Sequence, residues 1–417
     1  MILERNNRVS PDLYGQNSPE RFWRVQLDPP ASREEWDEAT RQAAVVLPSP
    51  VRAVADDTCR LLAMTLGEGQ FGPRHWEGGS AQRLYYLIKP AIPQRLTRGL
   101  RLAYGARRSG ELQMGWPIEP RYAWFQFGVI GHLLRITGRT SFPFLNFWPA
   151  GRRFALVLTH DIETAEGQSF VREVAALEEG LGFRSSFNFV PERYPLDRVL
   201  MEELRARGFE VGVHGLRHDG KLFSRPDEFM RSAARINGYL REFGAVGFRA
   251  PLTQRQPEWM QALDIEYDSS FFDTDLYEPI AGGTMSVWPF HLGRFVELPY
   301  TLVQDHTLVH ILGERTPRLW LEKVDFIASV HGMALMLTHP DYLRDPRAWR
   351  IYRNFLEVMD ERRDYYHALP VDVARWWRAR AAARGPEELP AGAAAEIAGI
   401  DGSELPSIRL SNQTLVT

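Results

Sequence analysis

The stretch Phe154-Ala-Leu-Val-Leu-Thr-His-Asp-Ile-Glu163 decides the fold that we expect for this chain. Its first five residues are apolar, which is typical of a strand buried on both faces in a parallel sheet. The run then ends in Thr159, His160 and Asp161, with Glu163 close behind. Because ligands of parallel α/β folds gather at the carboxyl ends of the strands, this polar end is a candidate functional site. Taken alone, the motif is better explained by a strand followed by a capped, solvated turn.

Downstream of this stretch, short apolar segments alternate with longer helical patterns. The alternation predicts repeated βα units and therefore a parallel sheet. About seven repeats favour an incomplete or distorted barrel or an open sheet, and periodicity does not distinguish the two. The expected strands are residues 154–158, 185–190, 209–213, 246–248, 265–267, 294–298, 333–337 and 366–369, and the expected helices are residues 169–181, 196–207, 226–243, 257–263, 318–331 and 347–363.

Changes in composition divide the chain into three expected parts. Residues 1–150 carry proline breaks between helical patterns, and we expect a mostly helical region of unknown role there. Residues 151–384 carry the βα units of the expected barrel. Residues 385–417 are rich in Gly, Pro, Ala and Ser at their start, which is typical of a flexible C-terminal tail.

The first part shows two helical patterns and a group of aromatic residues. Ser32 and Glu35 have the spacing of a capping box at the start of a helix over Ala31–Val46. A second, amphipathic helix is expected over Val51–Gly67. The aromatic residues between 116 and 148 either pack in a core or offer flat faces on which sugar rings stack.

The composition is that of an ordinary globular protein. Of its 417 residues, 44% are hydrophobic and 25% are charged, and the formal net charge is -3. This weak charge gives no reason to expect a nucleic-acid or membrane-surface partner. Cys59 is the only cysteine, which excludes an internal disulfide and a cysteine-based zinc cluster.

The compartment is expected from the lack of recognisable targeting signals in the sequence. The first residues, Met1–Arg8, are charged and lack the apolar core of a signal peptide. The sequence has no apolar run of about 18 residues, so we expect no membrane span. A cytoplasmic enzyme is the simplest expectation.

Four further polar groups follow predicted strands, as Asp161 does. His214 and His218 come directly after the strand 209–213, and on a helical turn this spacing places both rings on one face, where they can chelate one ion. Arg249-Ala-Pro251, Asp268 and Thr338-His339 each follow another short strand. Solvated turns do not readily explain five strand ends that carry carboxylates, imidazoles and a guanidinium. The sequence therefore predicts one shared site.

These motifs resemble the polysaccharide deacetylase family, the group of chitin and peptidoglycan deacetylases, over roughly residues 153–380. The opening motif Thr159-His160-Asp161-Ile162-Glu163 is similar to the Thr-His-Asp-x-Asp motif of one branch, with Glu in the last place. His214 and His218 match the family's His-(Ser/Thr)-x-x-His motif, with Gly215 in place of the hydroxyl residue.

Two later motifs complete the resemblance. Arg249-Ala-Pro251 matches the family's Arg-x-Pro motif, although leucine replaces the glycine that usually follows the proline, and His339 matches a histidine after a late strand. Family members have a distorted (β/α) barrel of about seven parallel strands. They bind one divalent metal ion, often zinc. The resemblance therefore implies this barrel, with zinc as the first choice of cofactor.

The resemblance also implies roles for the acids and histidines of the first two motifs. Glu163, His214 and His218 would hold the metal ion, and Asp161 would be the catalytic base. Strand alternation places residues two apart on one side, so Asp161 and Glu163 can both face the pocket. Their two roles can be exchanged without changing the motif.

The remaining motif residues would complete the machinery. Arg249 would hold the base carboxylate in place and keep it ionised. His339 would be protonated and donate to the departing amine. Asp268 would orient His339 or contact the substrate, and Pro251 would line the substrate site.

The function implied is a metal-dependent hydrolase that removes an acetyl group from an N-acetylated sugar or glycan precursor. Its expected partner is a small-molecule or glycan substrate. Two alternatives stay open, namely a hydrolase of a non-sugar C–N amide bond in the same fold and a non-catalytic glycan-binding protein that retains the barrel. The Glu163 and Gly215 substitutions are the reason for keeping the second.

Overall fold

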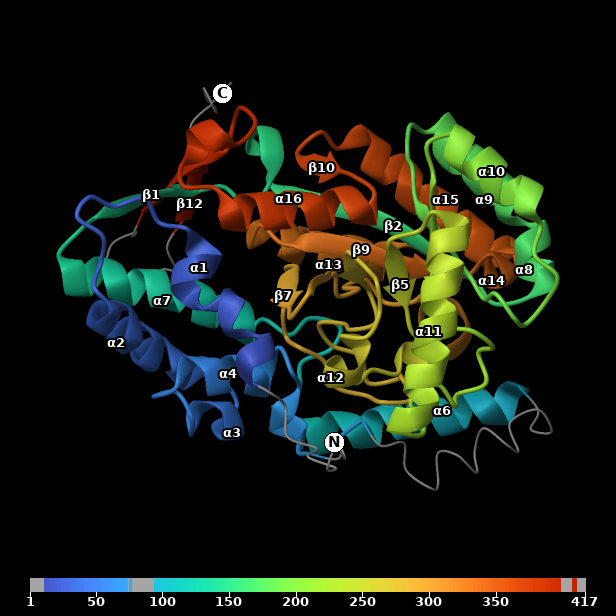
Figure 1. Ribbon diagram of the computed structural model, residues 1–417, viewed down its shortest axis with the longest axis horizontal. Helices are drawn as coiled ribbons and strands as arrows, with labels where there is room; N and C mark the ends of the chain where they lie inside the picture. Colours follow the sequence, from blue (N-terminus) through green and yellow to red (C-terminus); the bar gives the residue numbers. More distant parts are fainter. Residues whose placement is uncertain (1–10, 74, 77–93, 399–406, 411–417) are drawn as a thin grey trace.

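A computed structural model of the chain describes residues 11–73, 75–76, 94–398 and 407–410 (Figure 1). Within these residues the main element is a nine-stranded sheet in which every pair is parallel except β7–β8. Its strands are β2 (Phe154–Ile162), β3 (Ser186–Phe189), β4 (Glu210–His214), β5 (Gly247–Arg249), β6 (Tyr267–Asp268), β7 (Phe290–Leu292), β8 (Phe295–Glu297), β9 (Met333–Thr338) and β10 (Tyr365–His367).

The strand β2 is the centre of this sheet and is buried along its whole length. One edge of β2 pairs with β9 over Ala155–His160. The other edge pairs with β10 over Phe154–Leu156 and with β3 over Thr159–Ile162. The apolar run that opens the predicted barrel is thus a strand with neighbours on both edges and both faces covered, as the sequence predicts.

The sheet curls into a ring in the order β9, β2, β3, β4, β5, β6, β8. Backbone bonds close the gap between β8 and β9, because the amides of Thr301 and Leu302 donate to the Leu335 carbonyl over 3.0 and 3.1 Å. The ring is the predicted distorted barrel, with β7 and β10 as additions. The open sheet is excluded.

Helices lie between most of the successive strands of the barrel, although the described residues have none between β6, β7 and β8 (Figure 1). All the predicted strands and helices of the barrel are present, although most are shorter than predicted. The helices are α8 (Ala165–Ser169), α9 (Val171–Gly180), α10 (Arg198–Ala206), α11 (Pro226–Phe243), α12 (Pro257–Met260), α13 (Arg318–Ser329), α14 (Pro340–Leu343), α15 (Pro346–Glu361) and α16 (Pro370–Ala382). A π-helix, η8 (His306–Leu312), precedes α13.

The region before the barrel is mostly helical, as predicted, with α1 (Pro19–Trp23), α2 (Arg33–Ala43), α3 (Ser49–Arg52), α4 (Thr58–Thr65), α6 (Gln94–Leu112) and α7 (Arg121–Thr137). The capping box of Ser32 and Glu35 is confirmed at the start of α2. The single helix predicted over Val51–Gly67 is wrong. Asp57 accepts a hydrogen bond from the Arg60 amide and starts α4 there, after a turn that ends α3.

The segment after the barrel returns to this N-terminal region. The strand β11 (Ala394–Ala398) pairs antiparallel with β1 (Ser141–Leu145), and β12 (Ser407–Leu410) pairs with β11. This pairing corrects the prediction of a flexible tail for residues 394–398. An alanine-rich segment has little strand propensity of its own, and β1 supplies the partner that orders it.

Aromatic side chains join the N-terminal region to the barrel. Phe22 lies 5.2 Å from Trp288 in an edge contact, and Phe147 stacks on Trp377 of α16 at 6.4 Å between ring centroids. Phe22, Phe147, Trp288 and Trp377 are all buried. Phe147 of the predicted aromatic group therefore packs in a core. Among the described residues, no helix has the length and apolar character needed to cross a membrane.

Candidate active site

The polar side chains at the end of β2 lie on two different faces of the sheet, because neighbouring side chains of a strand point in opposite directions. Asp161 faces the interior of the barrel, where it lies close to Arg249 and His214. His160 faces the helices outside the ring, where Nε2 lies 2.7 Å from Glu178 of α9. The imidazole of His160 therefore belongs to the support of the barrel, not to the site.

Asp161 is held as an ionised carboxylate by two donors from neighbouring strands. Arg249 Nη1 donates to Oδ1 over 3.1 Å, and Asn188 Nδ2 donates to the same oxygen over 3.0 Å. Burial raises the pKa of Asp161, but the charges of Arg249, His214 and His339 and the hydrogen bond from Asn188 together outweigh burial, so the pKa lies below its usual value. The second oxygen, Oδ2, is directed toward His214, 3.6 Å from its Nε2.

The sequence analysis missed Asn188, which strand register places beside Asp161. Asn188 pairs with Asp161 of β2 on one side and with Gly212 of β4 on the other. A Cβ on Gly212 would lie 2.1 Å from Asn188 Oδ1, so glycine leaves the room that this amide needs. An asparagine in a short buried strand is the only signal that sequence offers for it.

His214 is positioned at the end of β4 with one ring nitrogen bonded and the other open. Nδ1 donates to the Arg249 carbonyl over 3.0 Å, because β4 and β5 are in register at these two residues. Burial lowers the pKa of His214 to about 4, so the ring is neutral at pH 7. Nε2 is buried and has no hydrogen-bond partner among the described residues, which leaves its lone pair available to a ligand.

The segment that links the two histidines is irregular, and the predicted helical turn is wrong there. Gly215 and His218 have φ angles of 62° and 53°, in the left-handed region. The ring of Pro251 packs against Gly215 so closely that a Cβ would lie 2.4 Å from its Cγ. Glycine in place of the family's hydroxyl residue therefore accommodates Pro251, and the turn brings His218 back toward His214, with ring centroids 5.1 Å apart.

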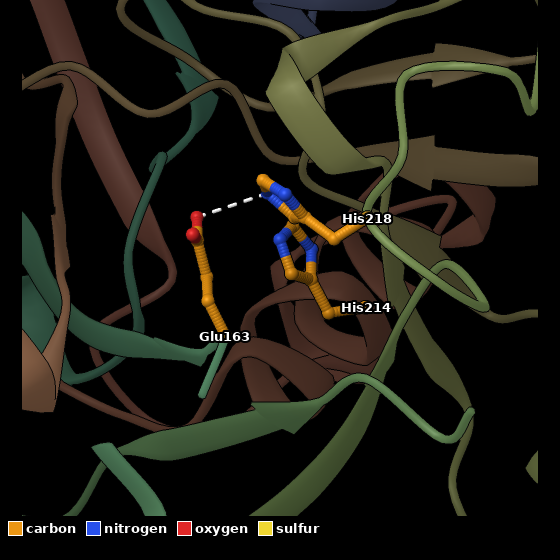
Figure 2. A group of neighbouring side chains, drawn as sticks. All are labelled: Glu163, His214 and His218. Carbon is orange, nitrogen blue, oxygen red and sulfur yellow. Dashed lines mark ion pairs between the residues drawn. The ribbon is translucent and has the colours of Figure 1, made fainter. Parts of the chain in front are cut away.

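Glu163, His214 and His218 come together as the sequence predicts (Figure 2). Glu163 Oε1 lies 2.9 Å from His218 Nε2, and one ligand atom from each of the three residues lies within 4.8 Å of the others. Burial raises the pKa of Glu163, but His218, His339 and His214 together outweigh burial, so the pKa lies well below its usual value. Two imidazoles and a carboxylate around one point are a donor set that suits a divalent ion such as zinc.

His339 approaches this group from the end of β9, with Nε2 3.6 Å from Glu163 Oε1. Its other nitrogen, Nδ1, donates to Asp305 Oδ1 over 2.8 Å, and its amide donates to Oδ2 of the same carboxylate over 2.8 Å. Burial lowers the pKa of His339, but Asp305, with smaller contributions from Glu163 and Asp161, outweighs burial, so the pKa is raised to about 10. The ring is therefore protonated at neutral pH, with the Nε2 proton directed toward the site.

Asp305 is the second residue that the sequence analysis missed. It precedes the π-helix η8 and accepts a hydrogen bond from the His306 amide over 2.7 Å. No strand or helix pattern marks this position in the sequence. Its contact with His339 corrects one role considered for Asp268, since Asp305 is the carboxylate that orients the imidazole.

Asp268 lies apart from the group, inside the barrel wall. It is fully buried and accepts hydrogen bonds from the Ser270 hydroxyl and amide over 2.7 and 3.1 Å. Burial raises the pKa of Asp268 and, more strongly, that of its neighbour Glu297, so the two share a proton. Pro251 is buried against Gly215, and its contact with a substrate stays a prediction.

Access to the site is from the side of Glu163. Its side chain is 18% exposed, whereas those of His339 and Asp161 are 6% and 3% exposed. The site is thus a buried cluster with one open face. Asp161 lies beside His214 and His339 lies beside Glu163, so an ionised acid and a protonated imidazole flank the group of Glu163, His214 and His218.

No family model matches the sequence, and no curated protein matches it. Solved structures with a similar fold include a protein described as a polysaccharide deacetylase from Mycobacterium smegmatis, with 19% identity and a TM-score of 0.46 over 56% of this chain and 93% of that chain. A peptidoglycan deacetylase from Bacillus subtilis has 12% identity and a TM-score of 0.37, over 55% and 95% of the two chains.

An allantoinase is also similar in fold, with 15% identity and a TM-score of 0.43 over 56% of this chain and 93% of that chain. Each of these three structures is similar to this chain over a little more than half of its length. At this level of similarity, activity and substrate do not transfer from those proteins to this one.

Proposed function

We propose that this protein is a metal-dependent hydrolase that removes the acetyl group from an N-acetylated sugar or glycan precursor. The observation that carries the proposal is the meeting of Glu163, His214 and His218 at one point, with Asp161 and His339 beside them. Asp161 approaches this group at His214, and His339 approaches it at Glu163. Amide hydrolysis of this kind needs a metal site, a general base and a general acid. These residues offer a candidate for each around one substrate amide bond.

The ligand set fits a divalent ion on the chemistry of its atoms. His214 Nε2 is neutral, buried and without a hydrogen-bond partner in the described structure, and its ring is fixed through Nδ1 by a backbone carbonyl. His218 and Glu163 complete the set, for which zinc is the first choice. When bound, the ion supplies Lewis acidity that activates water and polarises an acyl oxygen.

Asp161 is the proposed general base. Oδ1 is occupied by Arg249 and Asn188, so Oδ2 is the oxygen left to accept the proton of the attacking water. The same two donors keep the carboxylate from turning away and keep it ionised. Glu163, which already contacts His218, is then the metal ligand rather than the base.

His339 is the proposed general acid. Since Nδ1 is bonded to Asp305, only Nε2 can deliver a proton to the leaving nitrogen. In the full reaction, a water oxygen bonds to the acyl carbon and the carbon–nitrogen bond breaks. Asp161 takes the proton of the water and His339 gives one to the amine, so the products are acetate and a free amino sugar.

The test is acetate release and metal content of the purified wild type and of His214→Ala. The proposal expects a bound divalent ion and amide hydrolysis in the wild type, and loss of both in the variant. Panels of N-acetylated sugars and of open-chain and cyclic non-sugar amides separate the favoured substrate class from the first alternative. A wild type that binds no metal and hydrolyses no amide contradicts the enzymatic proposal.

A further inference from the structure

The N-terminal region reaches the candidate active site through a chain of buried side chains. We infer that Glu68, in this region, is a positioning residue that orders the loop carrying Asp305 and thereby fixes His339. The catalytic part of this inference rests on the proposed function. The contacts between Glu68 and the loop are independent of that function. The region before the barrel then becomes part of the active-site architecture.

The first link is a fully buried ion pair between Glu68 and Arg255. Arg255 Nε and Nη2 donate to the two carboxylate oxygens over 2.5 and 2.6 Å, and both side chains are 0% exposed. The guanidinium also lies over the ring of Phe272, 4.5 Å from its centroid. A bidentate pair in this setting fixes the position of Arg255 relative to the N-terminal region.

The second link is the loop after β5, which contains Pro251 and follows Arg249. Arg255 Nη1 donates to the Thr253 carbonyl over 2.8 Å. Leu252 and Thr253 have φ angles of 56° and 49°. Two consecutive side-chain-bearing residues in the left-handed region, one of them β-branched, persist only where the surroundings hold them, and such strain is typical of functional sites.

The third link joins this loop to the general acid. Thr253 Oγ1 donates to Glu278 Oε2 over 2.6 Å, and Gln304 Nε2 donates to Glu278 Oε1 over 2.6 Å. Gln304 precedes Asp305 in the chain, and Asp305 holds His339 Nδ1. Every link from Glu68 to His339 is therefore either a buried polar contact or a peptide bond.

A separate contact of the N-terminal region supports the same loop from the other side. Helix α6 lies along the η8 side of the barrel, and Arg101 Nη1 is 3.3 Å from His306 Nδ1. His306 is the first residue of η8, directly after Asp305. The N-terminal region thus contacts His306 directly, and it reaches Gln304, on the other side of Asp305, through the chain of contacts from Glu68.

Simple attachment of the two regions does not require this chain. Asn17 already bonds to β7 through the His291 backbone over 2.7 and 2.8 Å, and Arg380 donates to the Phe22 carbonyl over 2.8 Å. On the barrel side, these contacts end on His291 of β7 and Arg380 of α16, neither of which is placed in the candidate active site. Asn17→Ala is therefore a matched control that removes buried docking bonds and leaves the chain from Glu68 intact.

The experiment compares Glu68→Gln, Thr253→Val and Asn17→Ala with the wild type by hydrogen–deuterium exchange and steady-state kinetics. Thr253→Val preserves the side-chain shape and removes only one link, so it serves where Glu68→Gln folds poorly. We expect faster exchange over residues 303–312 in the first two variants but not in Asn17→Ala. We expect kcat to fall about tenfold, with KM and metal content near wild-type values.

Wild-type exchange over residues 303–312 in Thr253→Val overturns the inference, as does an equal change in Asn17→Ala. Faster exchange with an unchanged kcat also overturns it, because the ordering would then have no catalytic effect. If the wild type hydrolyses no amide, the proposed function fails, and the exchange data alone decide whether Glu68 orders the loop.

Discussion

Replacement of Asp305 by asparagine should move the alkaline limb of the kcat profile to lower pH. Asp305 is buried and lies 2.8 Å from Nδ1 of His339, and it is the main group that raises the pKa of His339 to about 10 against the effect of burial. A raised pKa keeps the general acid protonated, and therefore active, until the pH rises through that value. Loss of the carboxylate removes this support.

The size of the shift follows from the burial of the pair. Loss of one partner of a buried ion pair costs about 3–5 kcal/mol. Because one pKa unit corresponds to about 1.36 kcal/mol, the pKa of His339 should fall to roughly 6–8. With a value near 7, about 1% of the rings keep their proton at pH 9, against about 90% in the wild type. The variant should then lose on the order of a hundredfold in kcat at pH 9 and almost nothing at pH 6, where about 90% of its rings keep their proton.

The assay is acetate release at saturating substrate between pH 5 and pH 10 (roughly the range over which His339 should titrate). Asp197→Asn is the control, since Asp197 also caps a helix, accepting from the Leu200 amide over 3.0 Å, but belongs to α10. A variant whose kcat is reduced by the same factor at every pH would refute the assignment of His339 as the acid.

Three further outcomes follow from buried contacts. Gly215→Ser should destabilise the fold by about 1–3 kcal/mol in urea unfolding, because its Cβ would meet Pro251 and its φ of 62° disfavours any side chain; an unchanged midpoint would contradict this. Glu178→Ala should cost about 3–5 kcal/mol, measured in the same way, since His160 loses its buried carboxylate partner; a cost near that of a surface substitution would contradict it. Burial raises the pKa of Glu210 to about 7, so the protonated side chain contributes fully to stability at low pH, and this contribution is lost as pH rises through 7. Glu210→Gln should therefore make the free energy of unfolding less dependent on pH in this range. An unchanged pH dependence would contradict this assignment.

Apolar periodicity located the barrel and the residues directly at its strand ends. The parallel register then brings Asp161, His214 and Arg249 together, because carboxyl ends of neighbouring strands meet at one edge. Strand alternation alone also separates His160 from Asp161, and it could have assigned His160 to the outer face. These inferences depend only on local pattern.

Site residues in irregular segments could not be predicted from apolar periodicity. Asp305 precedes a π-helix, and Glu68 and Arg255 lie in loops far apart in the sequence, so no periodicity links them. The partner of β11 was equally hidden, because a strand with few β-branched residues depends on its neighbour for order. The helical turn predicted after His214 failed because the ring of Pro251, distant in sequence, dictates the conformation of Gly215.

Glu163, His214 and His218 are proposed to hold one metal ion. Anomalous diffraction at the zinc edge, on crystals of the wild-type protein grown with zinc, tests it most directly. The claim predicts one strong peak at about 2.0–2.2 Å from an atom of each of the three residues. A fully loaded crystal without a peak at this point, or with its peak on other side chains, would contradict it.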